Sequence, residues 1–308
     1  MLIEIIKRLR ECVVKKFEKG SKLSRKREIT AVILIISIII TATVLTRYPK
    51  SRKIPLTAAI IDQLEEHIPN SDFIDNITST LTSLNFSVVH HHYNEVDVKF
   101  FKELPRKNYG LIILRAHFAL RNDSSTVDIL TSEEYNESRY ISEVNSGLLA
   151  IGQYYIQGLT NKSYFAITAD FVSNEMDGYF PNSIIFAMGC WSMRPFSEQY
   201  FANPMAKAFL KRNAQVYIGW SDIITSNDSD YETAKLLKTF LTQNITLAQA
   251  INETRTYRYT AEGGIIITTR LSFSPYEAGE LTIEKILPNQ STQKMNKVFL
   301  IPIVKEEE

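Results

Sequence analysis

The chain has 308 residues, of which 44% are hydrophobic and 22% are charged, and its formal net charge is +1. This composition is that of a globular protein and excludes disordered and fibrous chains. The near-zero net charge gives no support for nucleic acid as a main partner, and two cysteines are too few for a disulfide-stapled scaffold.

The N-terminal part of the chain combines a basic segment with an apolar run. Residues 1–28 carry ten Lys or Arg and four Glu, whereas residues 29–46 (ITAVILIISIIITATVLT) carry no charge. Eighteen helical residues span about 27 Å, close to the thickness of a bilayer core. A signal peptide is the alternative, but its basic leader is normally short and its apolar run has about 7–15 residues. We therefore predict one transmembrane helix, with residues 1–28 in the cytoplasm by the positive-inside rule.

Glycosylation sequons follow this predicted anchor. Nine of the eighteen asparagines after residue 46 begin N-x-S/T with x not proline, whereas chance predicts roughly three. The excess predicts a glycosylated, extracytoplasmic domain, joined to the membrane by a linker at residues 47–55. The candidate sites are Asn76, Asn85, Asn122, Asn136, Asn161, Asn227, Asn244, Asn252 and Asn289.

Strands and helices are predicted to alternate over residues 56–260. Apolar runs such as YGLIILRA and SIIFAM are typical of strands buried on both faces of a parallel sheet. The pattern predicts an α/β domain with a central, mostly parallel sheet. Strands are expected at 56–62, 87–92, 109–116, 183–188 and 214–220, and helices at 72–84, 96–104, 204–211, 232–241 and 247–254.

Two regions depart from this alternation. Residues 118–180 are rich in polar loops, and we predict an insertion that contains a hairpin with strands at 148–156 and 164–172. Residues 261–308 are predicted to form a β-rich C-terminal extension. Its strands are expected at 265–273, 281–286 and 298–304.

Two residues with reaction chemistry follow buried strands. His117 follows YGLIILRA, and Cys190 follows SIIFAMG. Ligands of open α/β sheets bind beyond the carboxyl ends of strands, and histidine is the usual base that activates a cysteine nucleophile. If the two strands are neighbours, the backbone N–H groups of Phe118 and Cys190 can stabilise an oxyanion beside this dyad. The alternative is that Cys190 is a buried structural residue.

The order strand–His, hairpin, strand–Cys, helix, strand, helix resembles the caspase-like fold of clan CD cysteine peptidases. Gingipain-type and clostripain-type peptidases and CHAT domains share this fold. The matching stretches are LIILRAHF, SIIFAMGCWS, MAKAFLKRNAQVYIGWSD and LLKTFLTQNITLAQAI. The resemblance implies a three-layer α/β/α domain in which His117 is the general base or orienting group and Cys190 is the nucleophile. It also implies hydrolysis of peptide bonds through a thioester.

The resemblance also implies a pocket for the substrate residue before the scissile bond. Trp220, Ser221 and Asp222 match the strand end that helps to form this pocket in the family. An acidic residue there, or Asp170 at the end of its own strand, would select Lys or Arg in a substrate. Trp191, beside Cys190, is expected either to line the pocket or to pack in the core.

No cofactor or metal site is predicted. No Walker loop, G-x-G-x-x-G, H-E-x-x-H or G-x-S-x-G motif occurs. In a strand, His90 and His92 face one way and His91 faces the other. Two such histidines can share a metal ion, but no Asp, Cys or His cluster nearby completes a tetrahedral set, so a surface or strand-edge role is expected for them.

Two functions follow from these patterns. The first is a membrane-anchored, outward-facing cysteine peptidase that acts on a peptide or protein substrate. The second is a catalytically inactive caspase-like module that binds peptides or partner proteins at the cell surface. The second function is kept because Phe118 stands where the family usually has a glycine after the histidine. An active dyad is expected to need a thiolate-prone Cys190 that depends on His117.

Overall fold

The computed structural model describes residues 53–121, 126–153, 162–195 and 203–287. The predicted transmembrane helix at 29–46 and the basic segment before it lie outside the described residues. So do the sequon residues Asn122, Asn161 and Asn289 and the predicted strand at 298–304. In the part of the chain that is described, no helix is both long and apolar enough to cross a bilayer.

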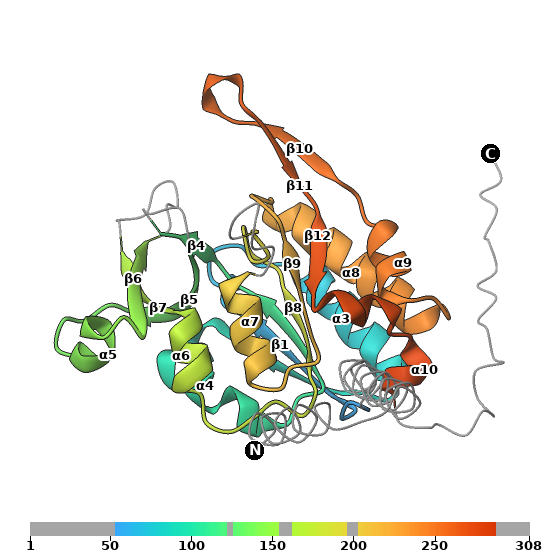
Figure 1. The fold of residues 1–308 in the computed structure, drawn as a ribbon, viewed down its shortest axis with the longest axis horizontal. Helices are drawn as coiled ribbons and strands as arrows, with labels where there is room; N and C mark the ends of the chain where they lie inside the picture. Colours follow the sequence, from blue (N-terminus) through green and yellow to red (C-terminus); the bar gives the residue numbers. More distant parts are fainter. Residues whose placement is uncertain (1–52, 122–125, 154–161, 196–202, 288–308) are drawn as a thin grey trace, which may run out of the picture. The chain divides into compact units, whose positions relative to one another are not determined.

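A six-stranded sheet forms the centre of the domain, in the order β12-β9-β8-β3-β1-β2 (Figure 1). In this sheet β1, β2, β3, β8 and β9 pair in parallel, and β12 pairs antiparallel to β9. The predicted α/β class with a mostly parallel sheet is therefore confirmed. The strands are β1 (Thr57–Asp62), β2 (Ser87–His91), β3 (Leu111–Arg115), β8 (Ile184–Ala187), β9 (Val216–Trp220) and β12 (Leu271–Ser274).

Helices cover both faces of this sheet because its central strands are apolar on both faces (Figure 1). In β3, Ile113 packs on one face and Leu114 on the other, as the alternation of strand side chains requires. One face carries α3 (Ser71–Ser83), α8 (Ser226–Thr242), α9 (Leu247–Asn252) and α10 (Ile283–Ile286). The other face carries α4 (Val98–Glu103), α6 (Ala169–Asn174) and α7 (Pro204–Lys211).

Helix α8 begins six residues before its predicted start at 232. Thr225 is its N-cap and accepts a hydrogen bond from the backbone N–H of Asp228 at 3.2 Å. The first turns of α8 are polar in sequence, yet Ser229 and Asp230 are buried. A helix is recognised in a sequence by the regular spacing of its apolar residues. These turns are buried through polar residues, so that spacing is absent from them.

The insertion is a four-stranded antiparallel sheet, in the order β4-β5-β7-β6. The predicted hairpin corresponds to β6 and β7, but its second strand ends at Ile167 because Thr168 caps α6. The strands are β4 (Phe118–Leu120), β5 (Val127–Glu134), β6 (Leu149–Gln153) and β7 (Ser163–Ile167), and α5 (Ile141–Asn145) precedes β6. Short 3₁₀ turns lie elsewhere in the domain at Tyr93–Glu95, Leu104–Lys107, Glu262–Gly264 and Tyr276–Glu280.

The described part of the C-terminal region, up to residue 287, combines strands with a short helix. Strands β10 (Tyr257–Thr260) and β11 (Ile266–Thr269) form a hairpin that projects from the domain (Figure 1), and β12 joins the main sheet. The predicted strand at 281–286 is wrong, because this segment forms the short helix α10. Ile283 and Ile286, three residues apart, both pack into the core, and this spacing is helical.

We expect Ile286→Ala to lower the free energy of unfolding by about 2–5 kcal/mol, because the side chain is fully buried and its removal leaves a cavity. The matched control is Ile266→Ala in the projecting hairpin, where the side chain is 68% exposed and the loss should be under about 0.5 kcal/mol. Chemical denaturation of the full chain, followed by tryptophan fluorescence, measures both. Equal losses would contradict the placement of α10 in the core.

Candidate functional site

The candidate site lies where the order of the parallel strands reverses. From β1 the chain moves to β2 at the edge of the sheet and then returns to β3 on the other side of β1. Segments leaving such a switch point separate and form a crevice at the carboxyl ends of the strands. A cavity of about 210 Å³ lies there. Its lining residues follow β1, β3, β8 and β9: Leu64, Ile68, Arg115, Ala116, His117, Met188, Gly189, Cys190, Ile224, Ser226, Ser229 and Asp230.

The structure therefore brings His117 and Cys190 to the wall of one cavity. Their strands, β3 and β8, are adjacent and parallel, and Leu114 pairs with Ala187 close to both strand ends. The two residues are 73 positions apart in sequence and are united by this pairing. The two residues therefore follow neighbouring strands and line the same cavity, as the predicted dyad requires.

Arg115 is the centre of a buried cluster of charged side chains, and Arg115 and Asp230 of this cluster line the cavity. The guanidinium has no exposed surface. Its Nη1 donates to Oδ1 of Asp62 at 2.8 Å, and its Nε and Nη2 donate to the two carboxylate oxygens of Asp230 at 2.9 Å each. Nη2 also donates to the carbonyl of Ile68 at 2.7 Å. Such a bidentate, charge-assisted arrangement fixes geometry as well as charge.

This cluster also holds the elements around the cavity. Asn70, the N-cap of α3, donates from Nδ2 to Oδ2 of Asp230 at 2.8 Å. Burial works to lower the pKa of Arg115, but the hydrogen bond and charge of Asp230, together with Asp62, raise it. Burial raises the pKa of Asp62, although Arg115 acts in the opposite direction. The guanidinium is therefore charged, and each of its three nitrogens donates at least one hydrogen bond to a neighbour.

His117 is held through its backbone and kept neutral by its surroundings. Its N–H donates to Oε1 of Gln63 at 2.9 Å, and its carbonyl accepts from the N–H of Leu130 at 2.9 Å. Burial lowers the pKa of the imidazole to about 4, and the nearby charges of His67 and Arg115 add to this effect. At neutral pH the ring is therefore an uncharged base.

The thiol of Cys190 lies between the wall of the cavity and the segment after β9. Its Sγ donates to the carbonyl of Ile224 at 3.3 Å and accepts from the N–H of the same residue at 3.5 Å. Burial raises the pKa of the thiol, and the charge of Asp222 raises it further. Burial outweighs the backbone hydrogen bonds that would favour the anion, so the resting thiol does not show the thiolate character that an active dyad was expected to need.

The backbone on both sides of Cys190 is tightly constrained. A Cβ on Gly189 would collide with the ring of Phe118 and the carbonyl of Ala116. Trp191 has a φ of 58°, which is uncommon for a bulky residue. Asp222 holds it there, accepting from the Trp191 N–H at 3.1 Å and from the indole Nε1 at 2.8 Å. Backbone strain of this kind gathers at functional sites.

The other predicted pocket residues do not line the cavity. Trp220 is fully buried in the core, where its Nε1 donates to Ser229, so its prediction as a pocket residue is not supported. Ser221 makes hydrogen bonds with Arg270 of the neighbouring strand segment. Asp170 is exposed in the first turn of α6. The acidic selection of Lys or Arg that was expected from these positions therefore stays a prediction.

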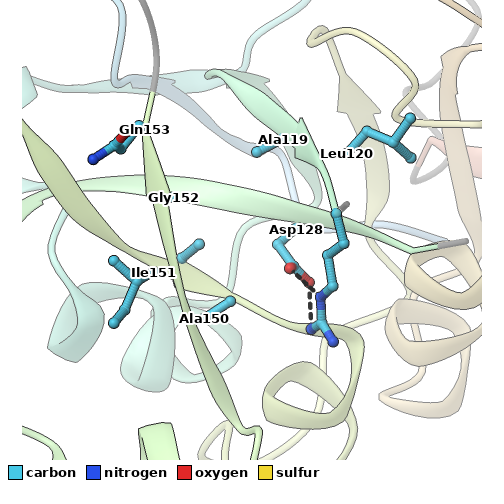
Figure 2. A pocket seen from close by; sticks show the side chains of 9 residues that line it. Ala119, Leu120, Asp128, Ala150, Ile151, Gly152 and Gln153 are labelled. Carbon is cyan, nitrogen blue, oxygen red and sulfur yellow. Dashed lines mark hydrogen bonds and ion pairs between the residues drawn. The ribbon is translucent and has the colours of Figure 1, made fainter. Parts of the chain in front are cut away.

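A second hollow lies on the sheet of the insertion (Figure 2). Small side chains such as Ala119, Ala150 and Gly152 leave it open, and Arg121 pairs with Asp128 at its edge at 2.6 Å. None of its lining residues is a nucleophile or a histidine. The His117 and Cys190 cavity is therefore the better candidate for covalent chemistry.

Comparison of the sequence with models of known protein families and with curated proteins finds no match.

Several site residues were not anticipated from the sequence. Arg115 ends an otherwise apolar strand. A charged residue in such a buried run indicates that an opposite charge lies buried beside it, and this was the only sign of the cluster in the sequence. Its partner Asp230 is 115 residues away and lies in the polar start of α8, which the helical pattern did not include. Ile68 and Ile224 line the cavity from loops that carry no chemical signature.

We expect Arg115→Met to lower the free energy of unfolding by about 3–5 kcal/mol, because it leaves Asp62 and Asp230 buried without their counter-charge. The matched control is Arg106→Met, whose exposed ion pair with Asp177 should contribute no more than about 1 kcal/mol. Urea denaturation of both variants gives the comparison. A small loss in Arg115→Met would show that the buried cluster does not hold the site.

The low pKa of His117 also predicts a pH dependence of stability. Below about pH 6.5 the unfolded chain binds a proton at this histidine, whereas the folded chain does so only near pH 4. Stability should therefore fall by about 3 kcal/mol between these values, since each pKa unit corresponds to about 1.4 kcal/mol.

His117→Gln serves as the reference for this effect. The difference in unfolding free energy between the wild type and this variant, measured from pH 7 to pH 4, isolates the histidine from other titrating groups. A constant difference across the range would refute the buried, neutral state of the ring.

Proposed function

We propose that this protein is a membrane-anchored, extracytoplasmic cysteine peptidase in which Cys190 is the nucleophile and His117 is the general base. The observation that carries the proposal is that both residues line one cavity at the carboxyl ends of adjacent parallel strands. The strained Trp191 beside the cysteine and the neutral state of the histidine support it. The caspase-like resemblance of the sequence agrees with the same assignment.

The mechanism starts from a neutral pair. As Sγ of Cys190 attacks the carbonyl carbon of a peptide bond, its proton passes to His117. The resulting oxyanion is stabilised by backbone N–H groups, for which Phe118 and Cys190 are the candidates. Collapse of the intermediate breaks the C–N bond, and the leaving amine takes the proton from His117. Water, deprotonated by His117, then hydrolyses the thioester and restores the thiol.

The two pKa shifts are compatible with this sequence of steps. A base with a pKa of about 4 remains unprotonated at neutral pH and is available to accept the thiol proton. The thiol is protonated until the substrate displaces the solvent and brings the electrophilic carbon to Sγ. Activity should therefore depend on proton transfer in the attack step and not on a preformed ion pair.

The membrane anchor and the sugars are part of the proposal. Residues 29–46 would span the bilayer, and residues 1–28 would remain in the cytoplasm. Six sequon asparagines lie in the described residues, and all six are exposed, which is compatible with glycosylation: Asn76, Asn85, Asn136, Asn227, Asn244 and Asn252.

A specific observation also favours the second candidate, an inactive module that binds peptides or partner proteins. The thiol is engaged by both backbone groups of Ile224, and burial raises its pKa. Phe118 packs on Gly189 directly before the cysteine, so its ring occupies space that a glycine would leave open. A binding cavity without turnover would have the same features.

Cleavage of a complex peptide library by the purified full chain, with products identified by mass spectrometry, tests the proposal. We expect cleavage by the wild type, and a loss of about 100-fold or more in both Cys190→Ala and His117→Gln, because a nucleophile or a general base is missing. Cys12→Ser is the matched control and should retain full activity, since this cysteine lies in the predicted cytoplasmic segment.

The same library separates the two candidate functions. Peptides that bind the wild type without being cleaved would support the inactive module and overturn the peptidase. Cleavage that survives in Cys190→Ala would also overturn the proposed mechanism. If the library contains neither ligands nor substrates, both functions are refuted for short peptides.

A further inference from the structure

A second group of reactive side chains lies one strand away from the cavity. His90 lies near the end of edge strand β2, His92 directly follows that strand, and Glu65 belongs to the segment that follows β1. One ligand atom from each of the three residues lies within 4.8 Å of the others. The spacing of the two histidines is visible in the sequence, whereas the carboxylate is not, because Glu65 is 27 residues away from His92.

The local structure explains why these three side chains converge. The backbone stays extended at His92, after the end of β2, so the alternation of the strand directs His90 and His92 to the same side, where their ring centroids lie 4.4 Å apart. His91 faces the opposite side and is buried there against Tyr109, with 2.8 Å between its Nε2 and the tyrosine hydroxyl. The parallel pairing of β1 with β2 brings the segment after β1 beside this strand end.

Hydrogen bonds hold the carboxylate in position. Oε1 of Glu65 lies 2.7 Å from Nδ1 of His92, and its Oε2 accepts from the backbone N–H of Tyr93 at 3.0 Å. Tetrahedral ligand atoms around a zinc ion lie about 3.3 Å apart. Small side-chain rotations that open the contact between Glu65 and His92 would therefore make room for an ion.

The buried side of the group has the features of a metal site as well. Nε2 of His90 is buried without a hydrogen-bond partner in the described part of the chain, and Oδ2 of Asp62 lies 3.8 Å from it. Metal-ligating histidines usually have a carboxylate of this kind behind the ring, which orients them and increases their basicity. The other oxygen of Asp62 is fixed by Arg115.

We propose that Glu65, His90 and His92 bind a divalent transition metal ion, with zinc favoured by the two imidazoles and one carboxylate. Imidazole nitrogen suits zinc, copper, nickel and iron, whereas magnesium and calcium prefer oxygen ligands. Three protein ligands leave one position of a tetrahedral ion open to water. Glu65 and His92 are partly exposed, so an ion can enter from solvent at the edge of the sheet.

The bound ion would restrict the motion of the segment around Glu65, which forms one wall of the cavity lined by His117 and Cys190. Leu64 and Ile68, on either side of Glu65, line that cavity. Gln63, two residues before Glu65, accepts the N–H of His117 and donates its own N–H to the carbonyl of Arg115 at 2.9 Å. The ion would connect this segment to β2, so its binding should make the segment less accessible to proteases.

Equilibrium dialysis of the untagged full chain against zinc, with the metal measured by mass spectrometry, tests this site. We expect one zinc ion per wild-type chain, and a loss of affinity on the order of 100-fold or more in Glu65→Gln and in His90→Ala. Glu66→Gln is the matched control, because this exposed neighbour carries the same charge and is outside the group. Circular dichroism without metal verifies that each variant is folded.

A competing assignment is that zinc binds to the candidate catalytic pair. Cys190→Ala should leave zinc binding unchanged, and cobalt substituted for zinc should show no thiolate charge-transfer band. The proposal is overturned if the wild type binds no zinc. It is also overturned if Glu65→Gln and His90→Ala bind as tightly as Glu66→Gln, or if Cys190→Ala abolishes binding. These outcomes are independent of whether the protein cleaves peptides.

Discussion

The buried guanidinium of Arg115 is the constraint on which the site depends. A charge without solvent contact must be matched by partners, and here they come from β1, α8 and the segment between β1 and α3. β3 and α8 are far in sequence from β1 and the segment after it, so the cluster fixes the relative positions of these three regions at the switch point of the sheet. His117 follows two residues after Arg115, and its position in the cavity is a direct consequence of this arrangement.

The same burial determines the charge state of the reactive pair. Removing water disfavours both an imidazolium and a thiolate, so it lowers the pKa of His117 and raises that of Cys190. Arg115 cannot compensate by stabilising a thiolate, because its donors are engaged by Asp62, Asp230 and a backbone carbonyl. A neutral pair is therefore the lower-energy state until a substrate supplies new electrostatic interactions.

The sequence predicted the features that are local and missed those that depend on distant pairing. Apolar runs located the strands of the main sheet, and the positions after two of them identified His117 and Cys190. The partners of Arg115 and of His92 lie 27 to 115 residues away, and no periodicity connects them. Trp220 illustrates the same limit, since its place at a strand end matches a pocket position of the family, whereas the structure places its large ring in the core.

All five histidines of the chain lie after or near the ends of β1, β2 and β3. The fold gives them different environments through strand alternation and burial. His91 points into the core, and His90 and His92 lie beside the carboxylate of Glu65. The charge of His67 contributes to the lowered pKa of His117. One short segment, from Gln63 to Asn70, contacts His117, His92 and Asp230. Because Leu64 and Ile68 of this segment line the cavity, we expect a change in the contacts of Glu65 to change the shape of that wall.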